Sequence, residues 1–160
     1  FRLDAVAVLV ARLLPRAVLV TPNLPEAELL AGRSLRTPQA RRTAVRELAA
    51  RFGGHVLLKG GHDPRDPATD LLAAPDGTLW RLTAPAVRHP LSTHGTGCTL
   101  SAAIAAGLAR RTPLLEAVRA AKAYVAAAIA AGVRVGPGTF AMGVPRHPDS
   151  AAVTVEPLGA

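Results

Sequence analysis

Short apolar runs alternate with amphipathic stretches along most of this chain. Ala17 to Thr21 and His55 to Lys59 are runs of the kind that form buried parallel strands. Between them, Asn23 opens one predicted helix that Gly32 ends, and Thr37 caps a second helix whose apolar positions recur at helical spacing. This alternation of strand, helix and strand predicts a parallel βαβ unit.

The remaining segments complete an α/β pattern. The apolar spacing of residues 1–14 predicts an opening helix that Pro15 stops, and residues 70–74 and 78–82 predict a hairpin at the sheet edge. Two alanine-rich helices are expected over 97–109 and 114–131. Because the chain starts inside a helix with no capping sequence before it, we expect it to be the later part of a longer protein.

Composition narrows the class of protein. The chain has 160 residues, of which 49% are hydrophobic, and this is enough for the core of one domain. A single cysteine excludes an internal disulfide and fits a cytoplasmic, reducing setting. Charged residues interrupt every long apolar run, and Asp4 and Arg12 lie inside the opening stretch, so we expect neither a membrane span nor a signal peptide.

The net charge of +8 raises the question of a nucleic-acid partner. The arginines are spread over many segments, and only three Phe, one Tyr and one Trp are available to stack on bases. We therefore expect no nucleic-acid partner and read the charge as a preference for arginine on solvated faces.

The most informative stretch is Ser92 to Ser101, where an extended segment becomes a helix. Gly95, Thr96 and Gly97 would bring backbone N–H groups close to an anion at the positive end of that helix. Cys98 would feel the same field, which stabilises a thiolate over a thiol and favours base or nucleophile chemistry. The alternative is a plain glycine turn followed by a free cysteine that packs as a small apolar residue.

Two further positions follow predicted strands. Asn23 and Glu26 have the three-residue spacing of a helix capping box, and they are also oxygen ligands suited to Mg²⁺ or its water shell. Lys59, in Lys59-Gly60-Gly61-His62, is either a phosphate contact or a solvated residue at a strand end. His89 and His94 have no partner at the spacing of metal ligands, so we expect them to be loop histidines.

Three segments are informative together: Thr21-Pro22-Asn23-Leu24-Pro25-Glu26-Ala27-Glu28, Leu58-Lys59-Gly60-Gly61-His62 and His94-Gly95-Thr96-Gly97-Cys98-Thr99-Leu100-Ser101-Ala102-Ala103-Ile104. In this order and spacing they resemble the hydroxymethylpyrimidine/phosphomethylpyrimidine kinases of thiamine biosynthesis, which belong to the ribokinase-like superfamily. The likeness extends from about Leu3 to Gly138 and includes Ala121-Lys122 and Tyr124-Val125.

The resemblance implies a three-layer α/β/α sandwich around a mostly parallel sheet, with ATP, Mg²⁺ and a small pyrimidine alcohol or its monophosphate as reactants. It implies that Cys98 is the base for the hydroxymethyl proton and that Gly95, Thr96 and Gly97 form an anion hole. Lys59 would contact phosphate, the region of Lys122 would lie near the nucleotide, and Asn23 and Glu26 would organise Mg²⁺. Members of this family commonly pair, so a homodimer is one expected assembly.

The chain also departs from the family pattern. Members are considerably longer at the N-terminal end, where most of the pyrimidine pocket lies, so residues 1–138 are expected to be the C-terminal part of a kinase domain. Residues 139–160 are rich in Gly and Pro, and we expect an irregular tail. Two alternatives stay open, a kinase of pyridoxal type and a truncated, non-catalytic nucleotide-binding remnant.

Overall fold

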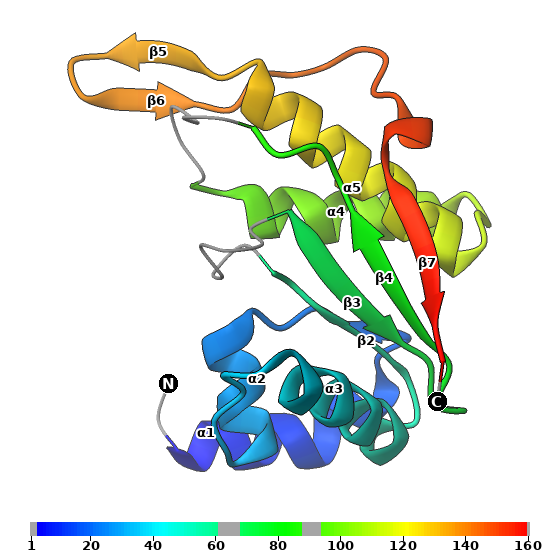
Figure 1. Cartoon of the computed structure of the whole chain (residues 1–160). Helices are drawn as coiled ribbons and strands as arrows, with labels where there is room; N and C mark the ends of the chain where they lie inside the picture. Colours follow the sequence, from blue (N-terminus) through cyan, green and yellow to red (C-terminus); the bar gives the residue numbers. More distant parts are fainter. Residues whose placement is uncertain (1–2, 61–67, 88–93, 160) are drawn as a thin grey trace. The chain divides into compact units, whose positions relative to one another are not determined.

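The structure is a computed structural model that describes residues 3–60, 68–87 and 94–159 (Figure 1). The chain divides into two compact units, which we describe separately. The first unit contains Phe1–Leu82 and Val155–Ala160, and the second contains Thr83–Thr154.

The first unit is built around a five-stranded sheet with the strand order β1-β2-β3-β4-β7. β1 and β2 are parallel, whereas β2 and β3 are antiparallel, so the sheet is mixed. The predicted βαβ unit and hairpin are both present. The strands are β1 (Leu19–Val20), β2 (His55–Leu58), β3 (Thr69–Ala73), β4 (Leu79–Thr83) and β7 (Thr154–Leu158).

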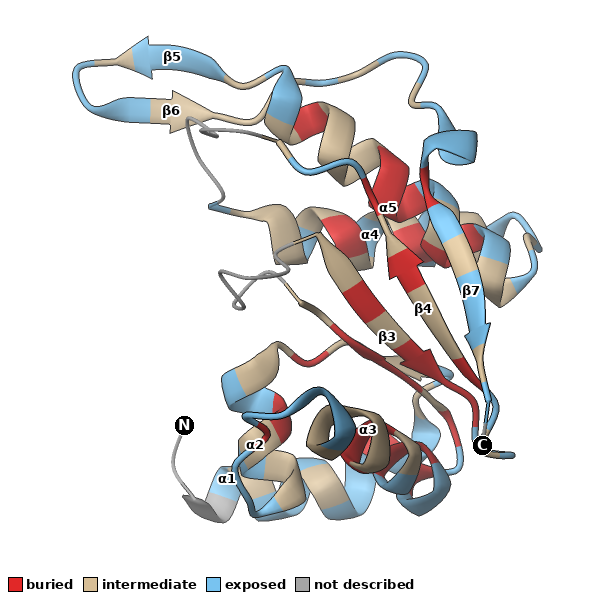
Figure 2. Cartoon of the chain, viewed as in Figure 1, coloured by how far each residue is buried: buried red, intermediate tan, exposed pale blue. Residues whose placement is uncertain are grey.

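The helices of the first unit begin and end where their capping residues lie. α2 (Leu24–Ala31) ends at Gly32 and α3 (Pro38–Phe52) ends at Gly53, each glycine in the left-handed conformation. α3 packs on β2 and β3. Figure 2 shows buried residues along α3 and along these strands. The core cluster includes Val45, Leu48, Phe52, Val56, Leu58 and Leu79.

The opening helix differs from its prediction. α1 (Leu3–Val8) continues as a π-helix over Leu9–Leu13 and then as a 3₁₀ turn over Leu14–Arg16. The α- and π-helical part ends at Leu13, before Pro15, and Pro15 itself lies in the first turn of the 3₁₀ segment, where a missing N–H costs nothing.

In the second unit, α4 (Thr96–Ala109) packs closely on α5 (Leu114–Ala130). A Cβ added at Gly107 would lie 3.0 Å from the Cβ of Ala117, so the two backbones approach closely only because these residues are small. The antiparallel pair β5 (Val133–Gly136) and β6 (Thr139–Ala141) follows, and then a 3₁₀ turn over Ser150–Ala152. No helix in the described ranges has both the length and the apolar character needed to cross a membrane.

The prediction of an irregular tail over 139–160 is wrong for its first residues, which form β6 (Thr139–Ala141), and for its last part. Residues Thr154–Leu158 form β7, an edge strand of the sheet. Val153 is buried and Val155 partly buried, whereas Thr154 and Glu156 are exposed, which is the period-two pattern of a half-buried strand. The sequence did not predict this strand because it contains Pro157. Proline is tolerated on an edge strand where its missing N–H would face the unpaired side.

Candidate functional site

Asn23 and Lys59 lie at the same edge of the sheet in the first unit. β1 and β2 pair in parallel, with Leu19 opposite His55 and Val20 opposite Val56, so their carboxyl ends point the same way. The N–H of Lys59 donates to the carbonyl of Pro22 at 3.0 Å, which joins the segments that follow the two strands. Open α/β sheets place their ligands at such an edge.

Asn23 and Glu26 form a complete capping box at the start of α2. The Asn23 side-chain oxygen accepts from the Glu26 N–H at 2.9 Å, and Glu26 Oε2 accepts from the Asn23 N–H at 2.8 Å. The structural alternative for this pair is therefore confirmed.

A role in holding Mg²⁺ stays a prediction. Glu26 is exposed, and its second oxygen, Oε1, takes no part in the capping box, so the pair still offers the oxygen ligands that Mg²⁺ prefers. Over the described ranges, no group of three or more His, Cys, Asp or Glu side chains is arranged to hold a metal ion. The residues fit a magnesium ion that keeps most of its water shell.

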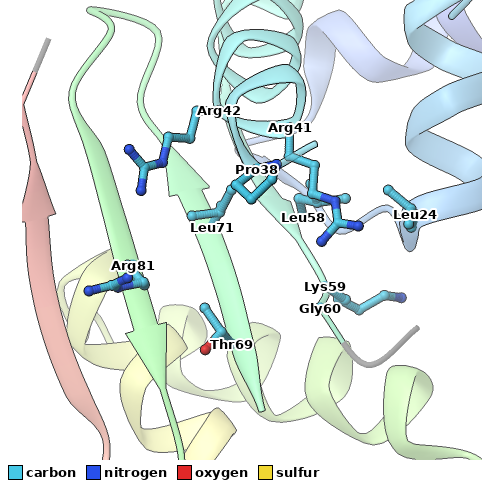
Figure 3. A pocket seen from close by; sticks show the side chains of 10 residues that line it. All are labelled: Leu24, Pro38, Arg41, Arg42, Leu58, Lys59, Gly60, Thr69, Leu71 and Arg81. Atoms are coloured by element: carbon cyan, nitrogen blue, oxygen red, sulfur yellow. The ribbon is translucent and has the colours of Figure 1, made fainter. Parts of the chain in front are cut away.

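A pocket of about 320 Å³ opens beside Lys59. Figure 3 shows Arg41 and Arg42 projecting from α3, and Thr69 and Arg81 on the neighbouring strands. The described lining combines apolar side chains with four cationic ones; its members are Leu24, Pro38, Arg41, Arg42, Leu58, Lys59, Gly60, Thr69, Leu71 and Arg81. A pocket lined by positively charged side chains attracts anions.

Two of the pocket arginines are held in place by other groups. Arg41 Nε donates to the carbonyl of Leu35 at 2.9 Å, and Arg81 forms an ion pair with Glu156. Sequence reasoning missed these arginines because α3 and β4 bring them to the pocket from distant parts of the chain. Within the sequence, the adjacent residues Arg41 and Arg42 near the start of α3 could have indicated a cationic surface.

Asp70 is a further residue that the sequence reasoning did not single out. It is 6% exposed, and its Oδ1 accepts from the N–H of Gly60 at 2.8 Å. A buried carboxylate that accepts from this amide fixes the backbone directly after Lys59. Asp70 therefore positions the strand end that carries the predicted phosphate contact.

In the second unit, the predicted anion hole coincides with the start of α4. Gly95 is the N-cap in the left-handed conformation (φ +81°), and the Thr99 N–H donates to the Gly95 carbonyl at 2.9 Å. The amides of Thr96, Gly97 and Cys98 precede that bond, at the positive end of the helix. Cys98 is exposed, which excludes the alternative of a buried, packed cysteine.

For the other predicted site residues, the structure gives a position but does not test a role. Lys122 lies in α5 and is only 7% exposed, and its nucleotide contact stays a prediction. His94 is exposed in the turn before α4. Ser92, Thr93, Gly61, His62 and His89 lie outside the described residues.

The predicted site residues fall in both units. Asn23, Glu26 and Lys59 with its cationic pocket lie in the first unit, and the start of α4 with Cys98 lies in the second. The first group offers oxygen ligands and cations, and the second offers backbone amides and a thiol. Groups of these kinds serve in transfer of a phosphoryl group.

Comparison with known proteins identifies the family. The sequence profile of the family described as phosphomethylpyrimidine kinase matches residues 1–143. The chain belongs to the phosphomethylpyrimidine kinase family. The resemblance stated from three motifs is thereby confirmed, and so is membership of a family of kinases.

Two relatives in this family illustrate the match. The chain is 53% identical over 135 residues to the hydroxymethylpyrimidine/phosphomethylpyrimidine kinase of Rhizobium meliloti (strain 1021), covering 84% of this chain and 50% of that protein. It is 44% identical over 135 residues to the thiamine biosynthesis bifunctional protein ThiED of Geobacter sulfurreducens, covering 84% of this chain and 27% of that protein. The chain thus spans about half the length of these relatives, or less.

A solved structure extends the likeness to three dimensions. The pyridoxal kinase from Staphylococcus aureus in complex with AMP-PCP is similar with a TM-score of 0.83 and 32% identity, over 97% of this chain and 57% of that one. This similarity confirms the predicted ribokinase-like α/β fold.

Proposed function

We propose that this chain supplies the nucleotide-binding and phosphoryl-transfer part of a cytoplasmic kinase that uses ATP to phosphorylate hydroxymethylpyrimidine and its monophosphate. The observation that carries the proposal is the match of 143 residues to the phosphomethylpyrimidine kinase family. The neighbouring structure that contains AMP-PCP, an analogue of ATP, supports ATP as the donor.

Cys98 acts as the base in this mechanism. The hydroxymethyl oxygen of the pyrimidine attacks the γ-phosphorus of ATP, while the bond from that phosphorus to the bridging oxygen breaks. The hydroxyl proton passes to Cys98 Sγ, and ADP leaves. The exposure of the thiol at the start of α4 supports this role, because a base must reach the substrate.

The start of α4 stabilises the charge that develops on the transferred group. Gly95 caps the helix and Thr96 and Gly97 begin it, so these amides need not reorganise during the reaction. Lys59 adds a cation for the phosphates, and Asp70 holds the backbone beside it through the Gly60 amide.

Mg²⁺ and the nucleotide complete the proposal. Asn23 and Glu26 would hold the water shell of the ion, and the region of Lys122 would lie near the nucleotide. When bound, Mg²⁺ neutralises charge on the β- and γ-phosphates. The capping box keeps both side chains in a fixed orientation at the strand edge.

A pyridoxal-type kinase is the second candidate, because the similar solved structures include pyridoxal kinases at 30–32% identity. The pyrimidine is preferred because the 53% identical relative carries the pyrimidine name. The two candidates differ in the alcohol that they accept, and both use the same residues of this chain.

The test has two stages. Calorimetry of the 160-residue chain with Mg·ATP measures nucleotide binding, and a coupled ADP assay with hydroxymethylpyrimidine and then pyridoxal measures transfer. We expect ATP to bind, and we expect transfer to the pyrimidine once the chain is joined to the unmatched part of the Rhizobium relative. No binding of ATP by either protein would refute the proposal, and transfer to pyridoxal alone would favour the second candidate.

A further inference from the structure

The proposed mechanism leaves part of the cationic pocket without a role. Lys59 is the predicted phosphate contact, whereas Arg41, Arg42 and Arg81 take no part in the proposed transfer of the phosphoryl group. Figure 3 shows the Lys59 side chain extending away from Arg42 and Arg81. We call the part of the pocket lined by Arg42 and Arg81 the arginine end; like the rest of the lining, it belongs to the first unit.

The arginine end lies on the face of the sheet that α3 covers. Arg81 follows Leu79 by two residues on β4, and side chains two residues apart on a strand share a face. Leu79 belongs to the core cluster that also contains Val45 and Leu48 of α3. Arg42 extends from α3 to line the same pocket (Figure 3). A helix and a strand thus each bring one guanidinium group to this end.

The positive charge of the arginine end is only partly balanced. Arg42 is half-buried, and no carboxylate in the part of the chain that the structure describes pairs with it. Arg81 does pair with Glu156, but the side chains of this pair are 40% and 51% exposed, so water screens it strongly. A guanidinium partly withdrawn from water without a counter-ion raises the free energy of the folded chain, and a bound anion lowers it.

The remaining lining indicates what the anion carries. Leu24, Pro38, Leu58 and Leu71 contribute apolar surface, and Leu24 and Leu71 are only partly buried against the core. The volume of about 320 Å³ suits a small organic molecule. Apolar surface beside two guanidinium groups favours a ligand with an apolar body and a strongly charged head. Guanidinium groups bind phosphate through paired hydrogen bonds, and a phosphate monoester carries up to two negative charges.

We propose that this pocket binds a small phosphate monoester. Arg42 and Arg81 hold its phosphate group, and its apolar body lies on Leu58 and Leu71. The site takes a phosphate compound in addition to the nucleotide, and it is separate from the groups assigned to phosphoryl transfer.

Phenyl phosphate is a suitable probe, because it joins a phosphate group to an apolar ring. The 160-residue chain is titrated by calorimetry with phenyl phosphate, with inorganic phosphate and with phenol, all at one ionic strength. We expect the dissociation constant of phenyl phosphate to be at least about 10-fold lower than that of either fragment. This experiment does not require the chain to bind ATP, so its outcome is independent of the proposed function.

Variants of Arg42 locate the site. Arg42→Gln should raise the dissociation constant of phenyl phosphate at least about 10-fold, because a charged hydrogen-bond donor to the phosphate is lost. Arg42→Lys keeps the charge without the planar pair of donors, so its affinity should be intermediate. The matched control is Arg36→Gln, which removes the same charge from an exposed residue just before α3 that does not line the pocket. The control should change the constant by less than about 2-fold.

Two further measurements complete the design. Circular dichroism melting checks that each variant folds like the parent chain; if Arg42→Gln lowers the melting temperature, Arg42→Lys against Arg36→Lys supplies the same comparison. The phenyl phosphate titration is then repeated with saturating Mg·ATP, and we expect the same dissociation constant.

Three results would overturn the proposal. Phenyl phosphate could bind no more tightly than inorganic phosphate, which would leave the apolar surface without a part in binding. Arg42→Gln and Arg36→Gln could weaken binding equally, which would indicate a general attraction of anions to a basic chain. In the third case, Mg·ATP could displace phenyl phosphate, and the arginine end would then belong to the nucleotide site.

Discussion

The helix starts of α2 and α4 solve the same physical problem in opposite ways. Both follow a turn, and both must satisfy amides that have no partner within the helix. α2 does so with its own side chains, through the capping box of Asn23 and Glu26. α4 begins at Gly95, which has no side chain to cap with. A helix start capped by its own side chains gains stability, whereas at a glycine N-cap no side chain of the capping residue occupies the place where an anion would bind.

The largest expected effect is on the rate of phosphoryl transfer, from a change at the start of α4. Cys98→Ala, in the chain joined to the unmatched part of the Rhizobium relative, should lower the rate of phosphoryl transfer about 10²- to 10⁴-fold, the usual contribution of a general base. ATP affinity should be almost unchanged, since the helix amides remain. Steady-state kinetics with calorimetry separate the two quantities. Full activity in this variant would exclude Cys98 as the base.

Gly95→Ala tests whether the start of α4 depends on the left-handed backbone conformation of its N-cap residue. A Cβ at φ +81° is strained, although among the described residues it would meet only the Met142 side chain, at 3.7 Å. We expect a loss of about 1–2 kcal/mol in the free energy of unfolding, measured by urea denaturation. Gly97→Ala is the control, because Gly97 lies within the first turn of α4, where alanine is favoured. Equal destabilisation by both changes would contradict the conformational argument.

Asn23→Ala tests the closed start of α2. Loss of the side-chain acceptor for the Glu26 N–H should cost about 1 kcal/mol in the free energy of unfolding. Asn23→Asp keeps an acceptor at the same place and should be close to neutral. A neutral Asn23→Ala variant would mean that α2 does not depend on its cap.

Glu26→Gln separates capping from magnesium binding. Glutamine at this position still completes a capping box, so the free energy of unfolding should change by less than about 0.5 kcal/mol. If the carboxylate organises Mg²⁺, the joined protein should need more magnesium for half-maximal activity. An unchanged magnesium requirement would leave Glu26 with its capping role alone.

The smallest effect concerns the far end of α2. The Leu35 N–H, at 2.7 Å, and the Ser34 hydroxyl, at 3.1 Å, donate to Glu28 and lower its pKa from the ordinary value of 4.5. A carboxyl with a lowered pKa in the folded state contributes stability above pH 4.5 and loses that contribution as the pH falls through the folded value. Glu28→Gln should therefore flatten the acid limb of a plot of stability against pH. If the Glu28→Gln variant and the parent chain lost stability equally as the pH falls, the stabilising role of the Glu28 carboxylate would be contradicted.

Elements with local end signals were predictable from the sequence. α2 and α3 have the caps and glycine stops that their residues indicate, and the strand edge followed from the parallel pairing of two short apolar runs. β7 was not predictable, because its five residues contain Pro157 and its partner β4 lies far away in the chain.

The candidate site shows the same division. Positions marked by a turn and a helix start, such as Asn23 and Cys98, could be identified from local spacing. Asp70 could not, because its role depends on a hydrogen bond to the Gly60 amide, which only the pairing of β2 with β3 brings within reach. The pocket arginines likewise gather through tertiary structure.

The second unit is an insertion into the first, and this bears on how the chain folds. Arg81 of β4 and Glu156 of β7 pair across 75 residues, so β7 can pair with β4 only after the whole insertion between them has been synthesised. The ends of the insertion adjoin, since the Thr154 hydroxyl donates to the Thr83 carbonyl at 3.4 Å. An insertion that folds first brings β7 beside β4 and removes most of the loop-closure entropy from the final step. We therefore expect β7 to pair late and rapidly, on a scaffold that is already formed.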